Sequence, residues 1–260
     1  MPGNGVGFVQ AGGHRLEVAR VGEATERAPI VLLHEGLGSV SVWRDFPGQL
    51  AQACGREVVV YSRVGYGRSE PLRHRHAVDY MDREANVVLP ELCAALGLRV
   101  PVLVGHSDGA SIALIRAGSA PDDRCQPAAI AVMAPHVFVE PVSLASIAAA
   151  REAFATTDLK AKLGRYHDDP EGAFRGWNDI WLDPAFAAWN IEALLPSIAC
   201  PVLAIQGEQD EYGTMAQLDA IAWRVPRCEQ LRLADCRHSP HRDQPQAVLA
   251  ALQRFCAAVP

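Results

Sequence analysis

The sequence predicts an α/β protein with a mostly parallel sheet of eight strands and helices on both faces. Short apolar runs, such as residues 29–34 and 57–61, alternate with segments of helical periodicity. Strands of a parallel sheet are covered on both faces and are therefore apolar throughout, unlike the alternating strands of a sheet with one wet face. The 260 residues also suffice to bury a sizeable core in one domain with an insertion.

The first half of the chain predicts a hairpin, followed by buried strands that alternate with helices. Gly12-Gly13 marks the hairpin turn, and Gly97 marks the end of a long helix. The predicted strands cover residues 5–11, 14–21, 29–34, 57–61, 100–104 and 128–133, and the predicted helices cover residues 42–54 and 79–96.

The middle of the chain interrupts this alternation. Residues 136–196 have a helical pattern and an unusual density of aromatic side chains. The alternation then resumes with a strand over 201–205, a helix over 215–225, a strand over 230–234 and a helix over 246–258. We therefore expect residues 1–135 and 197–260 to form the α/β core and residues 136–196 to form a helical insertion.

The composition argues against several classes of protein. No apolar run reaches the roughly 18 residues of a membrane span, and the start, Met-Pro-Gly-Asn-Gly, lacks the features of a secretory signal. We therefore expect a cytoplasmic protein that does not bind membranes. The formal net charge of −6 argues against nucleic acid as a partner, because phosphate binding needs a basic surface.

The cysteines and histidines do not predict a metal site. Seven cysteines without a Cys-x-x-Cys pair indicate reduced, mostly buried thiols rather than disulfides or a thiolate site. His74-x-His76 and His238-x-x-His241 have the spacing of metal ligands, but no third ligand is tied to either pair.

Residues 102–114 carry the strongest functional signal. An apolar strand runs directly into Gly105-His-Ser-Asp-Gly109, and a helical pattern follows. Glycines two residues before and two residues after Ser107 let the backbone make a sharp strand-to-helix turn without side-chain collisions. We therefore expect Ser107 at the apex of this turn, at the N-terminus of a helix.

This stretch resembles the nucleophile elbow of the α/β-hydrolase superfamily, and the resemblance extends over essentially the whole chain. In that fold the catalytic residues follow the order Ser, Asp or Glu, His. Asp210 and His238 come just after two later strands, so both lie at the sheet edge where Ser107 lies. The resemblance implies that Ser107 attacks an acyl carbon, His238 accepts its proton and Asp210 orients His238.

Each of the later two residues has a competitor. Glu208 and Glu211 share the loop of Asp210, although Asp210 matches the Gly-x-x-Asp turn of the family. His241 lies three residues after His238, and Arg237 stands where relatives usually have glycine. The resemblance favours Asp210 and His238.

The resemblance also implies an oxyanion hole built from backbone N–H groups. One donor would be Asp108, directly after the serine. The other would be Gly36 or Leu37, in the loop after the third strand.

Glu35 in the same loop is unusual, because a carboxylate facing an oxyanion would repel it. We expect either that Glu35 pairs with Arg63 or Arg44, or that it is a solvated loop acid.

The resemblance implies that the helical insertion is a cap over the active site. A lid shows part of its apolar face to the ligand, so some of its aromatic residues should line the pocket. The residues expected to contact substrate are His34, Glu35, Phe138, Trp177, Trp181 and Trp189.

The function implied by these features is a serine-triad hydrolase that cleaves a carboxylic ester of a small to medium, partly apolar acid or alcohol. The substrate is a small molecule, water is the second substrate and no cofactor is implied; assembly into a homo-oligomer stays open. The first alternative is C–C bond hydrolysis of meta-cleavage-type dienoate products, which needs a cation for the substrate carboxylate. The candidates for that cation are Arg63, Arg151, Arg165 and Arg175. The second alternative is a non-catalytic ligand receptor on the same fold.

Overall fold

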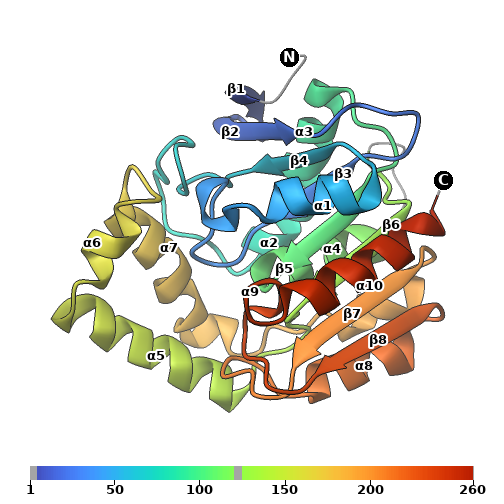
Figure 1. Ribbon diagram of the computed structural model, residues 1–260. Coiled ribbons are helices and arrows are strands. Elements are labelled where there is room, and N and C mark those ends of the chain that lie inside the picture. Colours follow the sequence, from blue (N-terminus) through green and yellow to red (C-terminus); the bar gives the residue numbers. More distant parts are fainter. Residues whose placement is uncertain (1–4, 120–124, 260) are drawn as a thin grey trace.

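A computed structural model describes residues 5–119 and 125–259 of the chain (Figure 1). The first four residues, on which part of the argument against a secretory signal rests, lie outside the described residues. The described residues form an eight-stranded sheet in the order β1-β2-β4-β3-β5-β6-β7-β8. The strands are β1 (Gly5–Ala11), β2 (His14–Val21), β3 (Ile30–Leu33), β4 (Val58–Tyr61), β5 (Val102–His106), β6 (Ala129–Met133), β7 (Val202–Gly207) and β8 (Cys228–Leu233).

The predicted α/β fold with a mostly parallel sheet is confirmed. β1 and β2 form the predicted antiparallel hairpin, and β2 is also antiparallel to β4. Every other pairing, from β4 across β3 to β8, is parallel. The carboxyl ends of β3, β5, β6, β7 and β8 therefore meet at one edge of the sheet, where open α/β sheets bind ligands.

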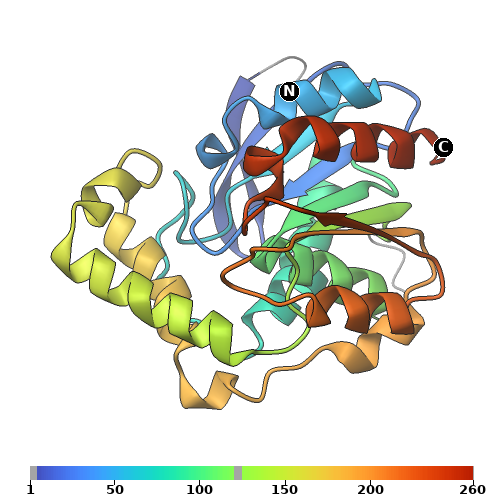
Figure 2. The same ribbon diagram turned by 60° about the horizontal axis from the view of Figure 1, so that its bottom comes forward.

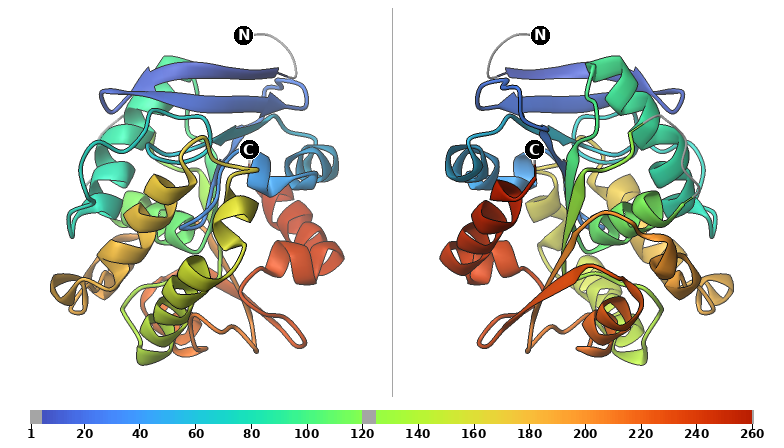
Figure 3. Two further views of the ribbon diagram at one scale, coloured as in Figure 1. Left: turned by 90° about the vertical axis from the view of Figure 1, so that its left-hand side faces the viewer. Right: turned by 90° about the vertical axis from the view of Figure 1, so that its right-hand side faces the viewer.

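Helices cover both faces of the sheet (Figure 3). Side chains of β3 alternate between two apolar clusters, because successive residues of a strand point to opposite faces: Ile30 and Leu32 join one cluster, and Val31 and Leu33 join the other. On the first face α1 (Phe46–Cys54) packs against α10 (Pro245–Ala257). The second face carries α2 (Tyr80–Arg83), α3 (Leu89–Leu96), α4 (Asp108–Gly118) and α8 (Ala216–Arg224). No helix in the described part of the chain has both the length and the apolar character needed to cross a membrane.

Two predicted helices are interrupted. The helix expected over 79–96 has a π-helical turn, η2 (Glu84–Val88), between α2 and α3. Pro90 lies at the start of α3 and has no N–H to donate, which favours a break in the regular ladder at this point. The helix expected over 42–54 is divided into η1 (Ser41–Trp43) and α1, because Arg44 has a positive φ of 52°.

Residues 136–196 are helical, as expected, and stand beside the sheet at the carboxyl ends of its strands (Figures 1 and 2). Trp177, Trp181 and Trp189 are all buried there. The elements of this segment are α5 (Pro141–Thr156), α6 (Leu159–Leu163), α7 (Pro170–Trp181), η3 (Pro184–Phe186) and η4 (Glu192–Ser197). The division of the chain into a core and a cap stays a prediction.

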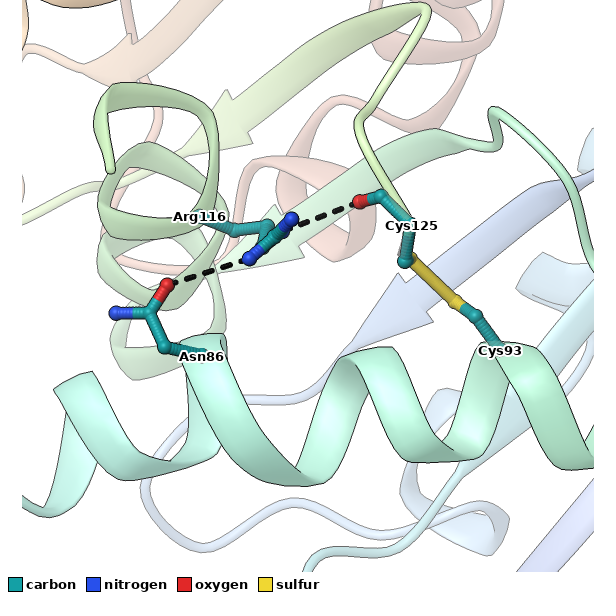
Figure 4. Close-up of a disulfide and its surroundings, with 4 residues drawn as sticks. All are labelled: Asn86, Cys93, Arg116 and Cys125. Carbon is teal, nitrogen blue, oxygen red and sulfur yellow. Dashed lines mark hydrogen bonds between the residues drawn. A yellow bond between two sulfur atoms is a disulfide. The ribbon is translucent and has the colours of Figure 1, made fainter. Parts of the chain in front are cut away.

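Cys93 of α3 and Cys125 are joined by a disulfide (Figure 4). Arg116 of α4 lies beside it and donates hydrogen bonds to the carbonyl oxygen of Cys125 and to Oδ1 of Asn86. The expectation that the cysteines are reduced is therefore wrong for this pair. The two residues are 32 positions apart without a motif, and only the packing of α3 beside the chain entering β6 brings their Cα atoms within 6.0 Å. The free cysteines are Cys54, Cys200, Cys228, Cys236 and Cys256.

The five tryptophans differ sharply in exposure. Trp223 of α8 is 81% exposed, and Arg224 lies over its ring. The other four are buried in the core or in the segment 136–196: Trp43, Trp177, Trp181 and Trp189.

Candidate active site

Ser107 occupies the predicted sharp turn between β5 and α4. Its φ of 53° and ψ of −118° are strained for a residue with a side chain. The flanking glycines make the turn possible, because a Cβ on Gly105 would lie 2.3 Å from the carbonyl oxygen of Gly109, and a Cβ on Gly109 would lie 2.1 Å from that of Leu33. Two backbone segments thus pass at a distance that no side chain allows.

Ser107, His238 and Asp210 are joined by hydrogen bonds, although they come from three separate loops. The Oγ atom of Ser107 lies 3.0 Å from Nε2 of His238, and Nδ1 of His238 lies 2.8 Å from Oδ1 of Asp210. Asp210 follows β7 and His238 follows β8, so the sheet edge brings them to the turn after β5. The structure therefore assembles the three residues that the sequence analysis selected.

The surroundings of Asp210 keep it ionised. Its Oδ1 also accepts the N–H groups of Tyr212 (2.8 Å) and Gly213 (3.3 Å), and Gln206 donates to its Oδ2. Burial opposes ionisation, but the hydrogen bond and charge of His238, followed by the N–H of Tyr212, outweigh it, so the pKa of Asp210 lies below its ordinary value. A carboxylate at Asp210 requires the proton of neutral His238 on Nδ1, which leaves Nε2 free to accept the Ser107 hydroxyl proton.

The other two acids on this loop, Glu208 and Glu211, do not face the imidazole ring of His238. Glu208 is exposed. Glu211 accepts the backbone N–H of His238 at 3.2 Å and lies 3.4 Å from the guanidinium of Arg237. Of the three acids, it is Asp210 whose carboxylate contacts the imidazole.

His241, the competitor of His238, lies in an apolar environment. It belongs to α9 (Pro240–Asp243), and its ring centroid is 4.9 Å from that of Trp43 and 5.3 Å from that of Phe46. Burial lowers the pKa of His241 well below its ordinary value, so the ring is neutral. The geometry thus separates a core histidine from the one that faces Ser107.

A cavity of about 110 Å³ opens beside Ser107. Its lining comes from the loop after β3, from the turn at Ser107, from the segment 136–196 and from the loops of the acid and the base. The lining residues are Glu35, Gly36, Leu37, Ser107, Asp108, His136, Ile147, Trp177, Trp181, Tyr212 and His238.

Three of the six residues expected to contact substrate line this cavity: Glu35, Trp177 and Trp181. His34 does not. It is fully buried, with Nδ1 donating to the carbonyl oxygen of Glu35 and Nε2 accepting the N–H of Arg63, so it shapes the loop.

Phe138 and Trp189 are also outside the cavity lining. Phe138 forms a β-bridge with Asn190, and the ring of Trp189 stacks on Phe186 at 5.3 Å. Both aromatic residues therefore pack within the segment 136–196, a distinction that residue type alone does not reveal.

His136, Ile147 and Tyr212 line the cavity but were not selected from the sequence. The rings of His136 and Tyr212 lie 5.9 and 4.6 Å from that of His238. A signal existed for these two, since His136 follows the strand β6 and Tyr212 follows Asp210 by two residues. Ile147 lies within α5, and nothing in the sequence distinguishes it from a core residue.

The carboxylate of Asp108 is buried in a network of donors. It accepts the hydroxyl of Tyr80 at 2.9 Å and the indole N–H of Trp181 at 3.2 Å, and Arg63 lies 3.6 Å away. Burial raises the pKa of Asp108, against the opposing effect of Arg63 and of the two hydrogen bonds. Trp181 thus ties the segment 136–196 to the residue next to Ser107.

The partners of the Glu35 carboxylate differ from those expected. One oxygen lies 3.5 Å from Nδ1 of His106, and the other lies 3.9 Å from the guanidinium of Arg242. Burial opposes ionisation, but His106 and Arg242 hold the pKa of Glu35 well below its ordinary value. The carboxylate of Glu35 is therefore ionised and lies between His106 and Arg242.

The expected pairing of Glu35 with Arg63 or Arg44 is wrong. The guanidinium of Arg63 donates to the carbonyl oxygens of His34 (2.6 Å) and Glu35 (3.1 Å) and faces Asp108. Arg44 points to the hydroxyl of Tyr166. Arg63 thus binds the main chain of the loop instead of its acidic side chain.

Known proteins resemble this chain to different extents. The model of the alpha/beta hydrolase family matches residues 30–252. Proline iminopeptidase from Lactobacillus delbrueckii subsp. lactis is 37% identical over 95 residues, which are 36% of this chain and 32% of that protein, so the match spans about a third of that relative. Polyketide synthase ThaQ from Burkholderia thailandensis is 26% identical over 94% of this chain and 12% of its own length. The crystal structure of VinJ superimposes with a TM-score of 0.78 at 22% identity over all of both chains, which shows the shared fold.

Proposed function

The chain belongs to the alpha/beta hydrolase family, and on that basis we propose that it is a serine hydrolase that cleaves carboxylic esters. The observation that carries this proposal is the hydrogen-bonded chain from Ser107 through His238 to Asp210, with its serine end in a cavity. The small cavity with tryptophan walls suits a small, partly apolar acyl or alcohol group. Water is the second substrate, so the reaction needs no cofactor.

The proposed reaction has two halves. Ser107 attacks the ester carbonyl carbon as His238 Nε2 takes its proton, and the same proton then passes to the leaving alcohol. An acyl group remains on Ser107. Water attacks this acyl-enzyme with His238 again as the base, which releases the acid and restores Ser107. Asp210 stabilises the imidazolium of His238 in both halves.

The oxyanion of each tetrahedral intermediate would be bound by backbone N–H groups. Asp108 is the first residue of α4, and an N–H in the first turn of a helix has no partner within the helix. The positive end of the α4 dipole adds to its effect. The second donor would be Gly36 or Leu37, since both line the same cavity as Ser107.

We further propose that residues 136–196 act as a cap on a core of residues 1–135 and 197–260. His136, Ile147, Trp177 and Trp181 come from this segment and line the cavity. The cap therefore helps to exclude water and to select the substrate.

The charge of the cavity favours an ester over a dienoate acid. None of the cavity-lining residues is an arginine or a lysine, whereas Glu35 and Asp108 are acids. The arginines considered as partners of a substrate carboxylate have other positions: Arg63 faces Asp108, Arg151 pairs with Asp179, Arg175 pairs with Glu171, and Arg165 is exposed. The described lining residues thus offer no cation to a substrate carboxylate.

Glu35 favours a second candidate, the release of an N-terminal residue from a peptide. Its ionised carboxylate belongs to a residue that lines the cavity and would attract a substrate ammonium group. The partial match with proline iminopeptidases supports this candidate.

A substrate panel tests these proposals. Purified protein and its Ser107→Ala variant would be assayed with p-nitrophenyl acetate and butyrate, proline p-nitroanilide and a meta-cleavage-type dienoate. We expect ester turnover by the wild type and a loss of at least about 10³-fold in the variant. Faster cleavage of the anilide would favour the peptidase, and faster cleavage of the dienoate would favour the C–C hydrolase. Tight binding of a ligand without turnover would favour the receptor.

A further inference from the structure

We propose that His106 is a positioning residue, which fixes the main chain of His238 next to Ser107 and is itself held by Glu35. This inference rests on the proposed function, because it assigns a role in placing the general base. His106 is the last residue of β5, is buried and directly precedes Ser107.

The hydrogen bond from His106 to His238 fixes one proton. Nε2 of His106 lies 2.7 Å from the backbone carbonyl oxygen of His238. A carbonyl oxygen only accepts, so Nε2 carries a proton and donates. One short segment therefore presents the nucleophile with Ser107 and binds the loop of the base with His106.

The other nitrogen of the ring faces a charge. Nδ1 of His106 lies 3.5 Å from Oε2 of Glu35. A carboxylate and a bare ring nitrogen both carry lone pairs and would repel one another, so a proton lies between them. The guanidinium of Arg242 lies 3.9 Å from the other oxygen of Glu35 and favours its ionised form, so we place this proton on Nδ1 of His106. In this arrangement His106 donates from Nε2 to His238 and from Nδ1 toward Glu35.

The rings packed against His106 belong to His241, Trp43 and His238 and carry no negative charge. The ring of His241 lies 4.9 Å from that of His106, and Trp43 lies 6.3 Å away. His241 is neutral because of its burial. The guanidinium of Arg242 lies 3.9 Å from Oε1 of Glu35, the oxygen that does not face His106. The ring of His238 lies 5.3 Å from that of His106.

The pair joins the three segments that the proposed mechanism uses. Glu35 belongs to the loop of the second oxyanion donor, His106 to the strand of the nucleophile and His238 to the loop of the base. The backbone N–H of His238 is held by Glu211 of the acid loop, whereas its carbonyl is held by His106. Loss of His106 would leave the carbonyl oxygen of His238 without this donor, so the loop of the base could shift. A displacement of about 1 Å at a reacting group lowers rates by about 100-fold.

An NMR measurement tests the protonation without any need for activity. Protein with ¹⁵N-labelled histidine, in the Ser107→Ala background, would be compared with the same protein carrying His106→Gln, which identifies the His106 signals. We expect both ring nitrogens of His106 to be protonated at neutral pH. A bare Nε2, or a Nδ1 that remains unprotonated beside Glu35, would overturn the inference.

Labelling of Ser107 by a fluorophosphonate, followed by intact mass, tests the effect on the nucleophile and does not depend on which ester is the substrate. We expect His106→Phe to slow labelling by about 10- to 100-fold. His106→Gln, whose amide can still donate toward the carbonyl of His238, should recover part of this loss. Glu35→Gln should show an intermediate loss. For an ester that is turned over, kcat should fall while KM stays within about twofold.

His241→Phe is the matched control, because it changes a neighbouring buried histidine that has no contact with the main chain of His238. It should label at the wild-type rate. Thermal melting of every variant identifies losses of labelling that come from unfolding. If His106→Phe does not fold, the labelling rates of His106→Gln and Glu35→Gln test the inference instead. Wild-type labelling by folded His106→Phe would overturn the inference. A wild type that labels but hydrolyses no ester would instead contradict the proposed function.

Discussion

His136, a residue of the active-site cavity, should make the unfolding free energy of the protein depend on pH. Its ring lines the cavity, and burial, followed by the charge of His238, lowers its pKa from 6.5 to about 3. The unfolded chain binds this proton below about pH 6.5, whereas the folded chain does not until about pH 3. The contribution to stability is therefore complete above pH 6.5 and declines as the pH falls. Between about pH 7 and pH 5 the folded state should lose about 2 kcal/mol through this residue.

The measurement is urea unfolding of the wild type and of His136→Phe at these two pH values. The variant keeps a ring of similar size beside Trp181 but cannot bind a proton. Its free energy of unfolding should therefore fall less on acidification. An equal fall in both proteins would show that other groups account for the pH dependence.

The residues that could be selected from the sequence share a local signal. Ser107 lies in a motif of five residues, and Asp210 and His238 each follow a strand whose apolar pattern is clear. The partners of Glu35 could not be selected in this way, because His106 and Arg242 approach it only in the folded chain. A single sequence indicates where a strand ends, but it does not indicate which loops approach one another in the folded chain.

At the scale of elements, the connection between α6 and α7 holds the loop after β3. His167 accepts the backbone N–H of Gly67 with Nδ1 and donates from Nε2 to the carbonyl oxygen of Leu37, each at 3.0 Å. Burial lowers the pKa of His167, which keeps the ring neutral and able to do both. His167→Phe would leave a buried N–H and a half-buried carbonyl without this partner, so we expect a loss of about 1–3 kcal/mol in unfolding free energy.

Chemical denaturation of His167→Phe measures this loss, and His167→Gln is the matched comparison. Glutamine can accept through its oxygen and donate through its nitrogen, so its loss should be smaller. Fluorophosphonate labelling of folded His167→Phe should also be slower, since Leu37 belongs to the proposed oxyanion loop. Equal stability of the two variants would argue that the histidine only fills space.

The elements themselves could be predicted where their signals are local. The hairpin β1–β2 has the predicted bounds, because Gly12 and Gly13 fix its turn and the alternation of side chains fixes its register. The interruption of the long helix at η2 could not be placed from periodicity, which continues through it. Pro90 was the available signal, since a proline inside a helical pattern indicates a local break.

At the scale of the whole molecule, the Cys93–Cys125 disulfide links α3 to the chain that enters β6. It closes a loop with a sequence separation of 32 residues. In the chain-entropy treatment, a cross-link of this length stabilises the folded state by about 3–4 kcal/mol, because it restricts the unfolded chain. A phosphine reductant should therefore lower the midpoint of urea unfolding.

The control for this effect is Cys93→Ala with Cys125→Ala, which retains the five free cysteines. Its unfolding midpoint should resemble that of the reduced wild type and should not respond to the reductant. An unchanged midpoint of the wild type on reduction would contradict a stabilising role for the bond.

The order of strands and the disulfide are global properties. Alternating strands and helices predicted a parallel sheet, but the position of β4 between β2 and β3 depends on pairing that no single stretch encodes. The odd number of cysteines without a Cys-x-x-Cys pair indicated free thiols. The Cys93–Cys125 bond could not be predicted, because it depends on how α3 packs beside the chain that enters β6. Disulfides are rare in cytosolic proteins, so this bond argues against the cytoplasmic location, which stays a prediction.

Because the tryptophans differ in exposure, the intrinsic fluorescence of the protein can report on the active site. The emission of Trp223 comes from an indole in water and should be red-shifted and insensitive to substrate, whereas Trp181 donates its N–H to Asp108 at the active site. In Trp223→Phe this background disappears, and the remaining ultraviolet fluorescence should report mainly on the indoles next to the cavity and in the core. A blue or red shift of the spectrum on addition of a non-hydrolysable ester analogue would then report the rate at which the ligand enters the cavity beside Trp177 and Trp181, without any dye.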